Sequence, residues 1–491
     1  MRSDFIVPLS LFAVIFLSTL SGCAKNPTDG ETVFIGLSSD EHELRLGRQH
    51  HPQFIKAFCG EFGSPILRKY VNSIGQLLAK TVERKRFKYT FTLLNSEIVN
   101  AFALPGGYVY ITRGLLALAS NEAELAGVLA HELGHINALH HGRRDGQGLV
   151  ANILMAGVGI ASGQNSTKWS QAQDLARYIT SGAISAYSRK HELEADRLAL
   201  RYMARAGYDP TAMVSFLNKM RSWSRLQAKQ LGKSPDKVDE FNYLATHPAP
   251  AERIHLANQL TAKYKVQNPI IATKVYLQKI TGILFGSDPQ QGLVLGQVFV
   301  HPKLKFRFKF PPNFRIFNTR NAVFAKGPNE APIIFDSARK PSDGPVTYYL
   351  QDIWWRNSRM TNVERLNING LDAATGTIQS RGADLRAVVI RKDLQTIYRF
   401  VFKTRPDDTS RLARTLRRST YSFRLLTERD VTDLKPLQIK VVRAKRGDTV
   451  STLSRMMAIR DRFSEERFKV LNGLTGNTPL SPGQQVKIIT N

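Results

Sequence analysis

The sequence His131-Glu132-Leu133-Gly134-His135 places two histidines four residues apart, with a glutamate directly after the first. On a helix this spacing puts both imidazoles on one face, one turn apart, where they can hold a single metal ion. The neighbouring carboxylate can then accept a proton from a metal-bound water. The motif therefore indicates the metal site of a zinc peptidase. A helix with two hydrogen-bonded core histidines is the alternative.

The residues around this motif predict a buried helix. Asn121 followed by Glu124 is typical of a helix N-cap with its reciprocal partner, and apolar residues then recur at helical spacing as far as Ile136. Inside a buried helix, histidines without partners would be costly. A metal ion or hydrogen bonds must therefore satisfy them.

Two candidates compete for the third metal ligand. His141 lies six residues past His135, as in a metzincin, but Ala138 stands where that pattern needs a glycine. Farther along the chain, Glu192 and Asp196 are four residues apart and share one face of a predicted helix. One of these carboxylates can bind zinc while the other accepts a hydrogen bond from a ligand histidine. A solvated, charged first turn is the alternative interpretation.

The segment before the motif is predicted to form a small sheet. Residues 87–94 and 98–103 have strand composition, Pro105-Gly106-Gly107 is typical of a turn, and residues 108–112 alternate as a short strand. An edge strand here could hold an extended substrate beside the metal through backbone hydrogen bonds. The candidate substrate strand comprises Asn100, Ala101, Phe102 and Ala103. A structural hairpin packed on the helix is the alternative.

Several motifs together resemble the gluzincin family of zinc metallopeptidases that includes the CAAX prenyl protease, the HtpX heat-shock protease and the periplasmic β-barrel-assembly-enhancing protease. They occur in the family's order and cover roughly residues 40 to 265. The motifs are Asn100 to Gly107, Asn121 to Ala126, His131 to His135, Glu192 to Asp196, and Thr246-His247-Pro248 with Arg253. The resemblance implies a zincin-type domain, mainly α-helical with a small β-sheet, and one Zn²⁺ ion per chain.

The resemblance also implies roles for the residues that would bind and surround this ion. The expected ligands are His131, His135 and Glu192. Glu132 would be the general base, and Asp196 would accept a hydrogen bond from a ligand histidine.

Two residues farther along the chain are expected near the metal by the same resemblance. His247 would either displace the zinc-bound water, and so hold the enzyme inactive, or donate to the developing oxyanion. Arg253 would steady that oxyanion or a carboxylate of the site.

The N-terminus is typical of an exported lipoprotein. Residues 1–22 have an apolar run over residues 5–17, too short for an ordinary transmembrane helix, and end in small residues as a signal peptide does. Leu20-Ser21-Gly22-Cys23 resembles a bacterial lipobox, in which Cys23 would be acylated. Ala24 implies sorting to the outer membrane, by resemblance to lipoproteins of enteric bacteria. A signal peptide without lipid attachment is the alternative.

The net charge and the cysteine content of the chain limit the kinds of partner and of covalent cross-link that it can have. The 491-residue chain carries a formal net charge of +29, which favours an anionic partner. The export signal argues against nucleic acid, and no RNA-binding pattern of interleaved aromatic residues accompanies the basic ones. Lipid head groups, lipopolysaccharide or acidic wall polymers explain the charge more simply. With Cys23 acylated, Cys59 would be the only other cysteine, so we expect no intrachain disulfide.

Changes in composition divide the chain into a series of units. After the signal peptide (1–22) and a tether (23–40), we expect the metallopeptidase domain at residues 41–265 and a linker at 266–295. Alternating apolar residues around Phe306 and two helical stretches then predict an α+β accessory domain at residues 296–428.

The last segment, residues 438–490, resembles a LysM module. It carries Gly447-Asp448-Thr449, Leu471-Asn472 and Pro482-Gly483-Gln484 between two predicted strands. The resemblance implies a βααβ fold that binds N-acetylglucosamine-containing glycans, here peptidoglycan. The fold class expected for the whole chain is therefore a multidomain protein.

We expect this chain to be a lipid-anchored zinc metalloendopeptidase on the periplasmic face of the outer membrane. It would cleave misfolded or misassembled periplasmic and outer-membrane proteins while bound to peptidoglycan. A non-enzymatic envelope chaperone or wall-anchored scaffold is the main rival, but such a protein would not need a general base at Glu132. A nucleic-acid binder is a more distant third hypothesis.

Overall fold

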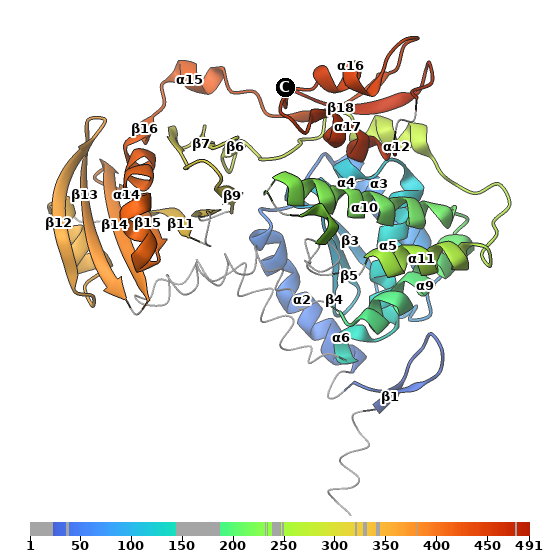
Figure 1. Ribbon diagram of the computed structural model, residues 1–491. Helices are drawn as coiled ribbons and strands as arrows, with labels where there is room; N and C mark the ends of the chain where they lie inside the picture. Colours follow the sequence, from blue (N-terminus) through green and yellow to red (C-terminus); the bar gives the residue numbers. More distant parts are fainter. Residues whose placement is uncertain are drawn as a thin grey trace, which may run out of the picture.

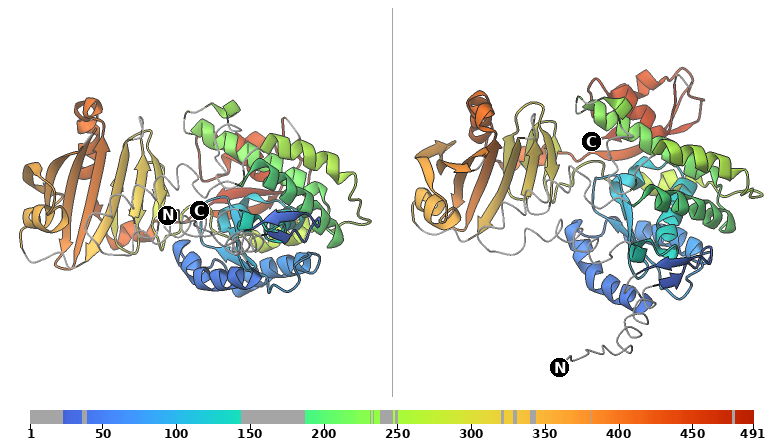
Figure 2. Two further views of the ribbon diagram at one scale, coloured as in Figure 1. Left: turned by 90° about the horizontal axis from the view of Figure 1, so that it is seen from below. Right: turned by 60° about the horizontal axis from the view of Figure 1, so that its bottom comes forward.

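The computed structural model describes residues 23–35, 39–143, 187–230, 232, 234–237, 247, 250–319, 322–327, 331–339, 344–380, 382–476 and 479–491. It has a helical domain, a sheet domain beside it, and a small C-terminal module packed on the helical domain (Figure 1). Figure 2 shows the same arrangement from two further directions. The expected multidomain fold class is confirmed.

A three-stranded sheet lies inside the helical domain. Its order is β3 (Thr90–Leu94), β5 (Tyr108–Thr112), β4 (Ala101–Leu104), with β3 parallel and β4 antiparallel to β5. Residues of β4 alternate between two cores. Ala101 and Ala103 join the core that contains α5, whereas Phe102 packs with residues of α2. These are the strands that the sequence predicted, and β4 is an end strand of the sheet.

Helices cover both faces of this sheet (Figure 1). Helix α2 packs against one face, and α3 and α5 pack against the other. The helices of this domain are α2 (Asp40–Ala57), α3 (Pro65–Ala79), α4 (Arg113–Leu118), α5 (Glu122–Asn137), α6 (His140–Arg143), α9 (Arg189–Arg205), α10 (Thr211–Gln230), the 3-10 turn η2 (Pro235–Lys237), α11 (Pro250–Thr261) and α12 (Thr273–Ile280). A hairpin of β1 (Cys23–Lys25) and β2 (Thr32–Phe34) precedes them.

Helix α5 begins at the cap that the sequence predicted. The Asn121 side chain accepts a hydrogen bond from the backbone N–H of Glu124 at 2.8 Å. The Glu124 carboxylate does not accept the reciprocal hydrogen bond from the backbone N–H of Asn121. It accepts instead from the backbone N–H of Ser120 at 2.7 Å and pairs with buried Lys219 at 2.6 Å. This ion pair lies in the core and keeps both charges partnered.

Helix α12 lies within the segment 266–295, for which the sequence predicts a linker. Its residues Tyr276, Leu277 and Ile280 are buried. The Tyr276 hydroxyl donates to the backbone carbonyl of Leu116 at 2.6 Å. This part of the segment is therefore an integral part of the helical domain.

The sheet domain contains two antiparallel sheets with a shared core. The seven-stranded sheet has the order β12 (Met360–Ile368), β13 (Leu371–Ser380), β14 (Ala383–Asp393), β15 (Thr396–Thr404), β11 (Pro332–Arg339), β10 (Ala322–Lys326), β9 (Arg315–Asn318), and the four-stranded sheet has the order β16 (Arg424–Leu425), β8 (Phe306–Lys309), β7 (Val298–His301), β6 (Leu293–Leu295). Aromatic side chains such as Phe308, Phe335 and Phe400 fill the core between them. Helix α14 (Pro406–Tyr421) packs into this core. The other face of the larger sheet is covered by α13 (Val346–Tyr348) and the π-helical turn η4 (Tyr349–Trp354). Helix α15 (Glu428–Thr432) follows β16.

The C-terminal module has the expected βααβ order. It consists of β17 (Gln438–Arg443), α16 (Val450–Arg455), α17 (Ser464–Asn472) and β18 (Gln485–Thr490), and its core is continuous with that of the helical domain. Buried Lys487 of β18 donates to the backbone carbonyls of Ala117, Leu118 and Ala119 at 2.9, 2.9 and 2.6 Å. This amine caps the C-terminus of α4, and burial lowers the pKa of Lys487 well below its usual range. The module is thus firmly packed against the helical domain.

The expected signal peptide at residues 1–22 lies outside the residues that the structure describes. Within the described ranges, none of the helices combines the length and apolar character that crossing a bilayer requires.

Candidate metal centre

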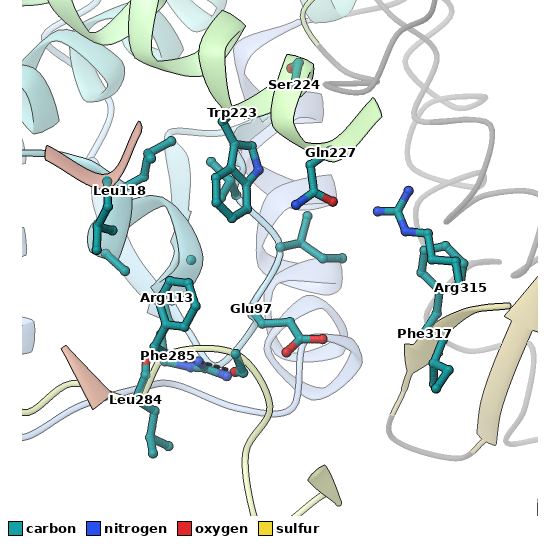
Figure 3. Close-up of a pocket in the computed structure, with 17 residues that line it drawn as sticks. Glu97, Arg113, Leu118, Trp223, Ser224, Gln227, Leu284, Phe285, Arg315 and Phe317 are labelled. Carbon is teal, nitrogen blue, oxygen red and sulfur yellow. Dashed lines mark hydrogen bonds between the residues drawn. The ribbon is translucent and has the colours of Figure 1, made fainter. Parts of the chain in front are cut away.

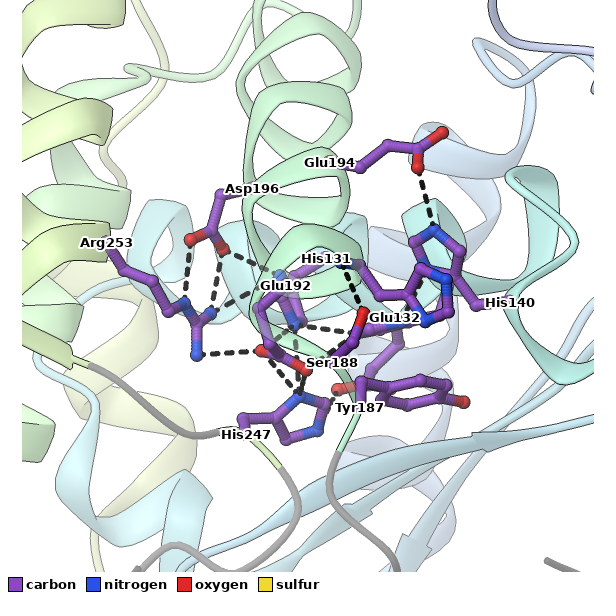
Figure 4. A network of polar contacts seen from close by, with 12 residues as sticks. His131, Glu132, His140, Tyr187, Ser188, Glu192, Glu194, Asp196, His247 and Arg253 are labelled. Atoms are coloured by element: carbon purple, nitrogen blue, oxygen red, sulfur yellow. Dashed lines mark hydrogen bonds and ion pairs between the residues drawn. The ribbon is translucent and has the colours of Figure 1, made fainter. Parts of the chain in front are cut away.

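Four side chains converge where α5, α9 and residue 247 meet, and Figure 4 labels three of them, His131, Glu192 and His247. The four are His131, His135, Glu192 and His247, and one ligand atom from each lies within 4.8 Å of all the others. His131 Nε2 is 3.0 Å from His135 Nε2 and 3.4 Å from Glu192 Oε2. The structure thus brings the three expected ligands together and adds His247 as a fourth member.

The residues of this cluster fit a zinc ion. Two imidazoles and one carboxylate are a common ligand set for catalytic zinc. Tetrahedral ligands about 2.0–2.1 Å from a zinc ion are about 3.3 Å from one another. The separations of 3.0 to 3.5 Å among His131, His135 and Glu192 are close to that value.

The outer nitrogen of His131 is held by a carboxylate. His131 Nδ1 lies 2.8 Å from Asp196 Oδ1, which leaves Nε2 facing the other ligands. Arg253 donates to both oxygens of Asp196 through Nε and Nη2, each at 2.7 Å, and its Nη1 is 3.0 Å from Glu192 Oε2. Asp196 therefore lies where the resemblance implied. Arg253 was expected to steady either the oxyanion or a carboxylate of the site. Its position fits the second role.

Three further residues around His135 were not identified from the sequence. Tyr187 stacks on the His135 ring with centroids 3.8 Å apart, and His140 Nδ1 lies 2.9 Å from His135 Nδ1. Glu194 in turn contacts His140. Of these three residues, only His140 could have been noticed in the sequence, because it is a histidine five residues past His135. His141, the alternative third ligand, contacts the Tyr187 hydroxyl at 3.0 Å and is not part of the cluster.

The electrostatics of the cluster set the charge of each member. Burial, followed by the charges of neighbouring histidines, lowers the pKa of His135 far below its ordinary value, so this ring stays neutral as metal binding requires. Burial tends to raise the pKa of Glu192, but His247 and Arg253 outweigh it and leave this pKa below its usual range. Burial likewise disfavours the charged form of His247, yet Glu192 and Glu132 raise its pKa to about 10. In the absence of metal, a protonated His247 therefore lies between two carboxylates.

Glu132 lies beside the cluster. Its Oε1 is 3.3 Å from His247 Nε2. Its Oε2 is buried without a hydrogen-bond partner among the residues described. A water molecule at the metal would satisfy this oxygen, and such a water is the partner that a general base needs.

The candidate substrate strand coincides with β4 and the residue before it. β4 pairs with β5 on one side, and its other edge pairs with no strand of the described ranges. Ala101, Phe102 and Ala103 are 4, 4 and 5% exposed. Asn100 contacts Thr112 of β5 through its backbone. The end position of β4 is the one required for strand addition, and its side chains belong to the cores beneath.

A separate pocket lies where the helical domain, the C-terminal module and β9 of the sheet domain meet (Figure 3). Arg113 is buried there and donates through Nη1 to the carbonyls of Leu284 and Gly286 at 3.1 and 2.6 Å. Glu97 accepts from the Ser287 hydroxyl at 3.1 Å. These groups tie the segment after α12 to the helical domain. None of the expected site residues lines this pocket.

Comparisons with known proteins agree with this geometry. Residues 65–261 match peptidase family M48, and residues 442–488 match the LysM domain. The chain is 29% identical to the β-barrel assembly-enhancing protease of Yersinia pestis over 275 residues, which are 53% of this chain and 52% of that protein. It is also 29% identical to the protein of the same name from Escherichia coli (strain K12) over 245 residues, 47% of this chain and 46% of that protein.

A further relative matches a shorter part of the chain. The mitochondrial metalloendopeptidase OMA1 of Arabidopsis thaliana is 31% identical over 182 residues, which are 37% of this chain and 33% of that protein. The chain spans about half the length of the two bacterial relatives that it matches.

Proposed function

Because residues 65–261 form a peptidase family M48 domain and residues 442–488 form a LysM domain, we propose that this chain is a zinc-dependent endopeptidase of the cell envelope. The observation that carries the proposal is the convergence of His131, His135 and Glu192 beside the buried, unpartnered Glu132 oxygen. A binding or scaffolding role would require neither this ligand set nor a general base at its side.

A zinc ion held by His131, His135 and Glu192 would lower the pKa of its bound water and polarise the scissile carbonyl. Glu132 would take a proton from the attacking water and deliver it to the leaving amine. Asp196 keeps His131 in the tautomer whose Nε2 faces the other ligands. The edge of β4 holds the substrate backbone in extended form.

In this account His247 restrains the site. Its Nδ1 is 2.9 Å from Glu192 Oε1 and 3.2 Å from His131 Nε2, so it stands where a fourth ligand would be. A histidine in that place excludes the water that the reaction requires. The proposed resting state is therefore closed, and catalysis requires the His247 side chain to withdraw.

The substrates proposed are misfolded or misassembled periplasmic and outer-membrane proteins. The names of the bacterial relatives support a client related to β-barrel assembly. A LysM domain supports attachment to peptidoglycan, and the net charge of +29 supports contact with anionic envelope polymers. An acylated Cys23 would hold the chain on the periplasmic face of the outer membrane.

The test is reversible metal removal followed by client capture. Dialysis against a chelator should abolish cleavage of an unfolded protein substrate, and one equivalent of Zn²⁺ should restore it. Glu132→Gln protein expressed in cells should then retain envelope proteins that the parent releases as fragments. If the metal-free chain cleaves at the parent rate, the proposal is wrong.

A further inference from the structure

The zinc ligand His135 is linked to the N-terminal hairpin by a chain of hydrogen bonds. His135 Nδ1 is 2.9 Å from His140 Nδ1, and His140 Nε2 is 3.1 Å from Glu194 Oε2. The other Glu194 oxygen, Oε1, accepts from Asn26 Nδ2 at 2.9 Å. The four residues come from α5, α6, α9 and the turn between β1 and β2. Figure 4 shows the contact between His140 and Glu194.

Only one set of proton positions satisfies all of these contacts when His135 Nε2 faces the metal. His135 Nδ1–H then donates to His140 Nδ1, and His140 Nε2–H donates to Glu194. Glu194 accepts from His140 through one carboxylate oxygen and from Asn26 through the other. A partner on the outer nitrogen fixes a ligand histidine in its tautomer and makes it more basic, which raises metal affinity.

The hydrogen-bonded series His135, His140, Glu194 and Asn26, which we call the relay, is shielded from solvent. His135, His140 and Asn26 are each 0% exposed, and the side chain of Glu194 is 13% exposed. The His140 ring is also stacked on His191, with centroids 4.3 Å apart. Water can therefore hardly replace a lost member of the relay, and a broken link leaves a buried polar group without its partner.

The hairpin fixes the orientation of the Asn26 amide. Asn26 Oδ1 accepts from both the backbone N–H and the hydroxyl of Thr28, at 3.1 and 2.8 Å. The backbone of Asn26 is bonded to Glu31 and Gly30 at 2.7 and 2.8 Å. The amide nitrogen is thereby directed at Glu194. Asn26 is thus a donor that is supplied by the docked hairpin.

We propose that Asn26, Glu194 and His140 are positioning residues for the zinc ligand His135, so that zinc affinity depends on docking of the hairpin at residues 23–35. This inference rests on the proposed function, because it assumes that His135 binds zinc. Asn26 follows Cys23 by three residues, which span at most about 10 Å of chain. A pull on Cys23 would therefore act directly on the relay and weaken zinc binding.

The test measures the zinc dissociation constant of the purified full chain by competition with a chelator of known affinity. Asn26→Asp places a carboxylate against Glu194, and Glu194→Gln places an amide nitrogen against that of Asn26. Each should weaken zinc binding by about 10- to 100-fold, as for loss of a partner of a ligand histidine. The pair Asn26→Asp with Glu194→Gln exchanges donor and acceptor, so it should restore most of the affinity that Asn26→Asp loses.

The control is Arg197→Gln, which changes an exposed residue of α9 close to Glu194 and should leave zinc affinity unchanged. The relay is refuted if both single variants bind zinc as the parent does, if the double variant stays as weak as Asn26→Asp, or if Arg197→Gln weakens binding equally. A merely structural effect would not be reversed by the exchange. If the parent itself binds no zinc, the proposed function fails. If the parent binds zinc and the variants do not differ from it, only the relay fails.

Discussion

Gly134 of α5 lies against the backbone of Ala195 of α9. A Cβ atom at residue 134 would be 3.0 Å from the Ala195 carbonyl oxygen and 3.1 Å from its Cα. Gly134 stands between the histidines of α5, and Ala195 stands between Glu192 and Asp196 of α9. The absence of a side chain at residue 134 therefore sets the distance between the two helices that supply the ligands.

Gly134→Ala should weaken zinc binding by about tenfold or more, because displaced ligand helices lose the geometry that the metal requires. The matched control is Gly127→Ala on the same helix. A Cβ there would meet the Met213 and Met203 sulfur atoms at 3.2 and 3.3 Å, and flexible methionine side chains can move away. Chelator competition on both variants checks the prediction. Equal zinc affinities would show that the close contact is irrelevant to the metal.

Lys487→Met should destabilise the helical domain as well as the LysM domain, because three carbonyl groups at the end of α4 would lose their donor. The expected cost is about 1–3 kcal/mol, the cost of a buried unsatisfied polar group. Lys440→Met changes an exposed lysine of β17 and should have little effect. Urea unfolding followed by circular dichroism compares the two, and identical midpoints would contradict the role of Lys487.

His247→Ala should retain zinc and cleave an unfolded peptide faster than the parent, because the site would no longer be closed by the imidazole. The initial rate of hydrolysis at saturating zinc is the measurement. If the rate instead falls by about a hundredfold or more, His247 is an oxyanion donor. An unchanged rate rules out both roles.

The stability of the zinc-free protein should fall as pH rises from 6.5 to about 10. Glu192 and Glu132 raise the pKa of His247 from 6.5 to about 10 in the folded chain, against the effect of burial. A raised pKa in the folded state stabilises the protein fully below the unfolded value, and this stabilisation is lost as pH rises through the folded value. The free energy of unfolding, measured in a chelator across this range, should be less pH-dependent in His247→Gln than in the parent. If the free energy of unfolding depends on pH in the same way in both proteins, His247 does not pair with Glu192 and Glu132 in the folded chain.

Local rules predicted much of the site from the sequence. The spacing of His131 and His135 fixed their common helix face, and the Asn121 cap fixed where that helix begins. The resemblance supplied the order of the later motifs. The structure places Glu192 and His247 in one cluster with the two histidines of α5, and Arg253 pairs with Glu192. These features depend on short motifs that are visible in the sequence.

Contacts between distant segments could not be predicted in this way. Asn26 and Glu194 are 168 residues apart, and nothing in either local sequence indicates the other. Lys487 looked like an ordinary strand lysine, but it is buried because its partners are carbonyls at the end of a helix 370 residues earlier. Side chains that recognise backbone carbonyls leave no pattern in the partner's sequence.

The most direct test of the account compares Glu132→Gln with the parent in one experiment that records zinc content and peptide hydrolysis together. We expect about one zinc ion per chain in both proteins, and hydrolysis slower by about 10²- to 10⁴-fold in the variant, because only the general base is lost. Hydrolysis at the parent rate in a zinc-loaded Glu132→Gln protein would contradict the account.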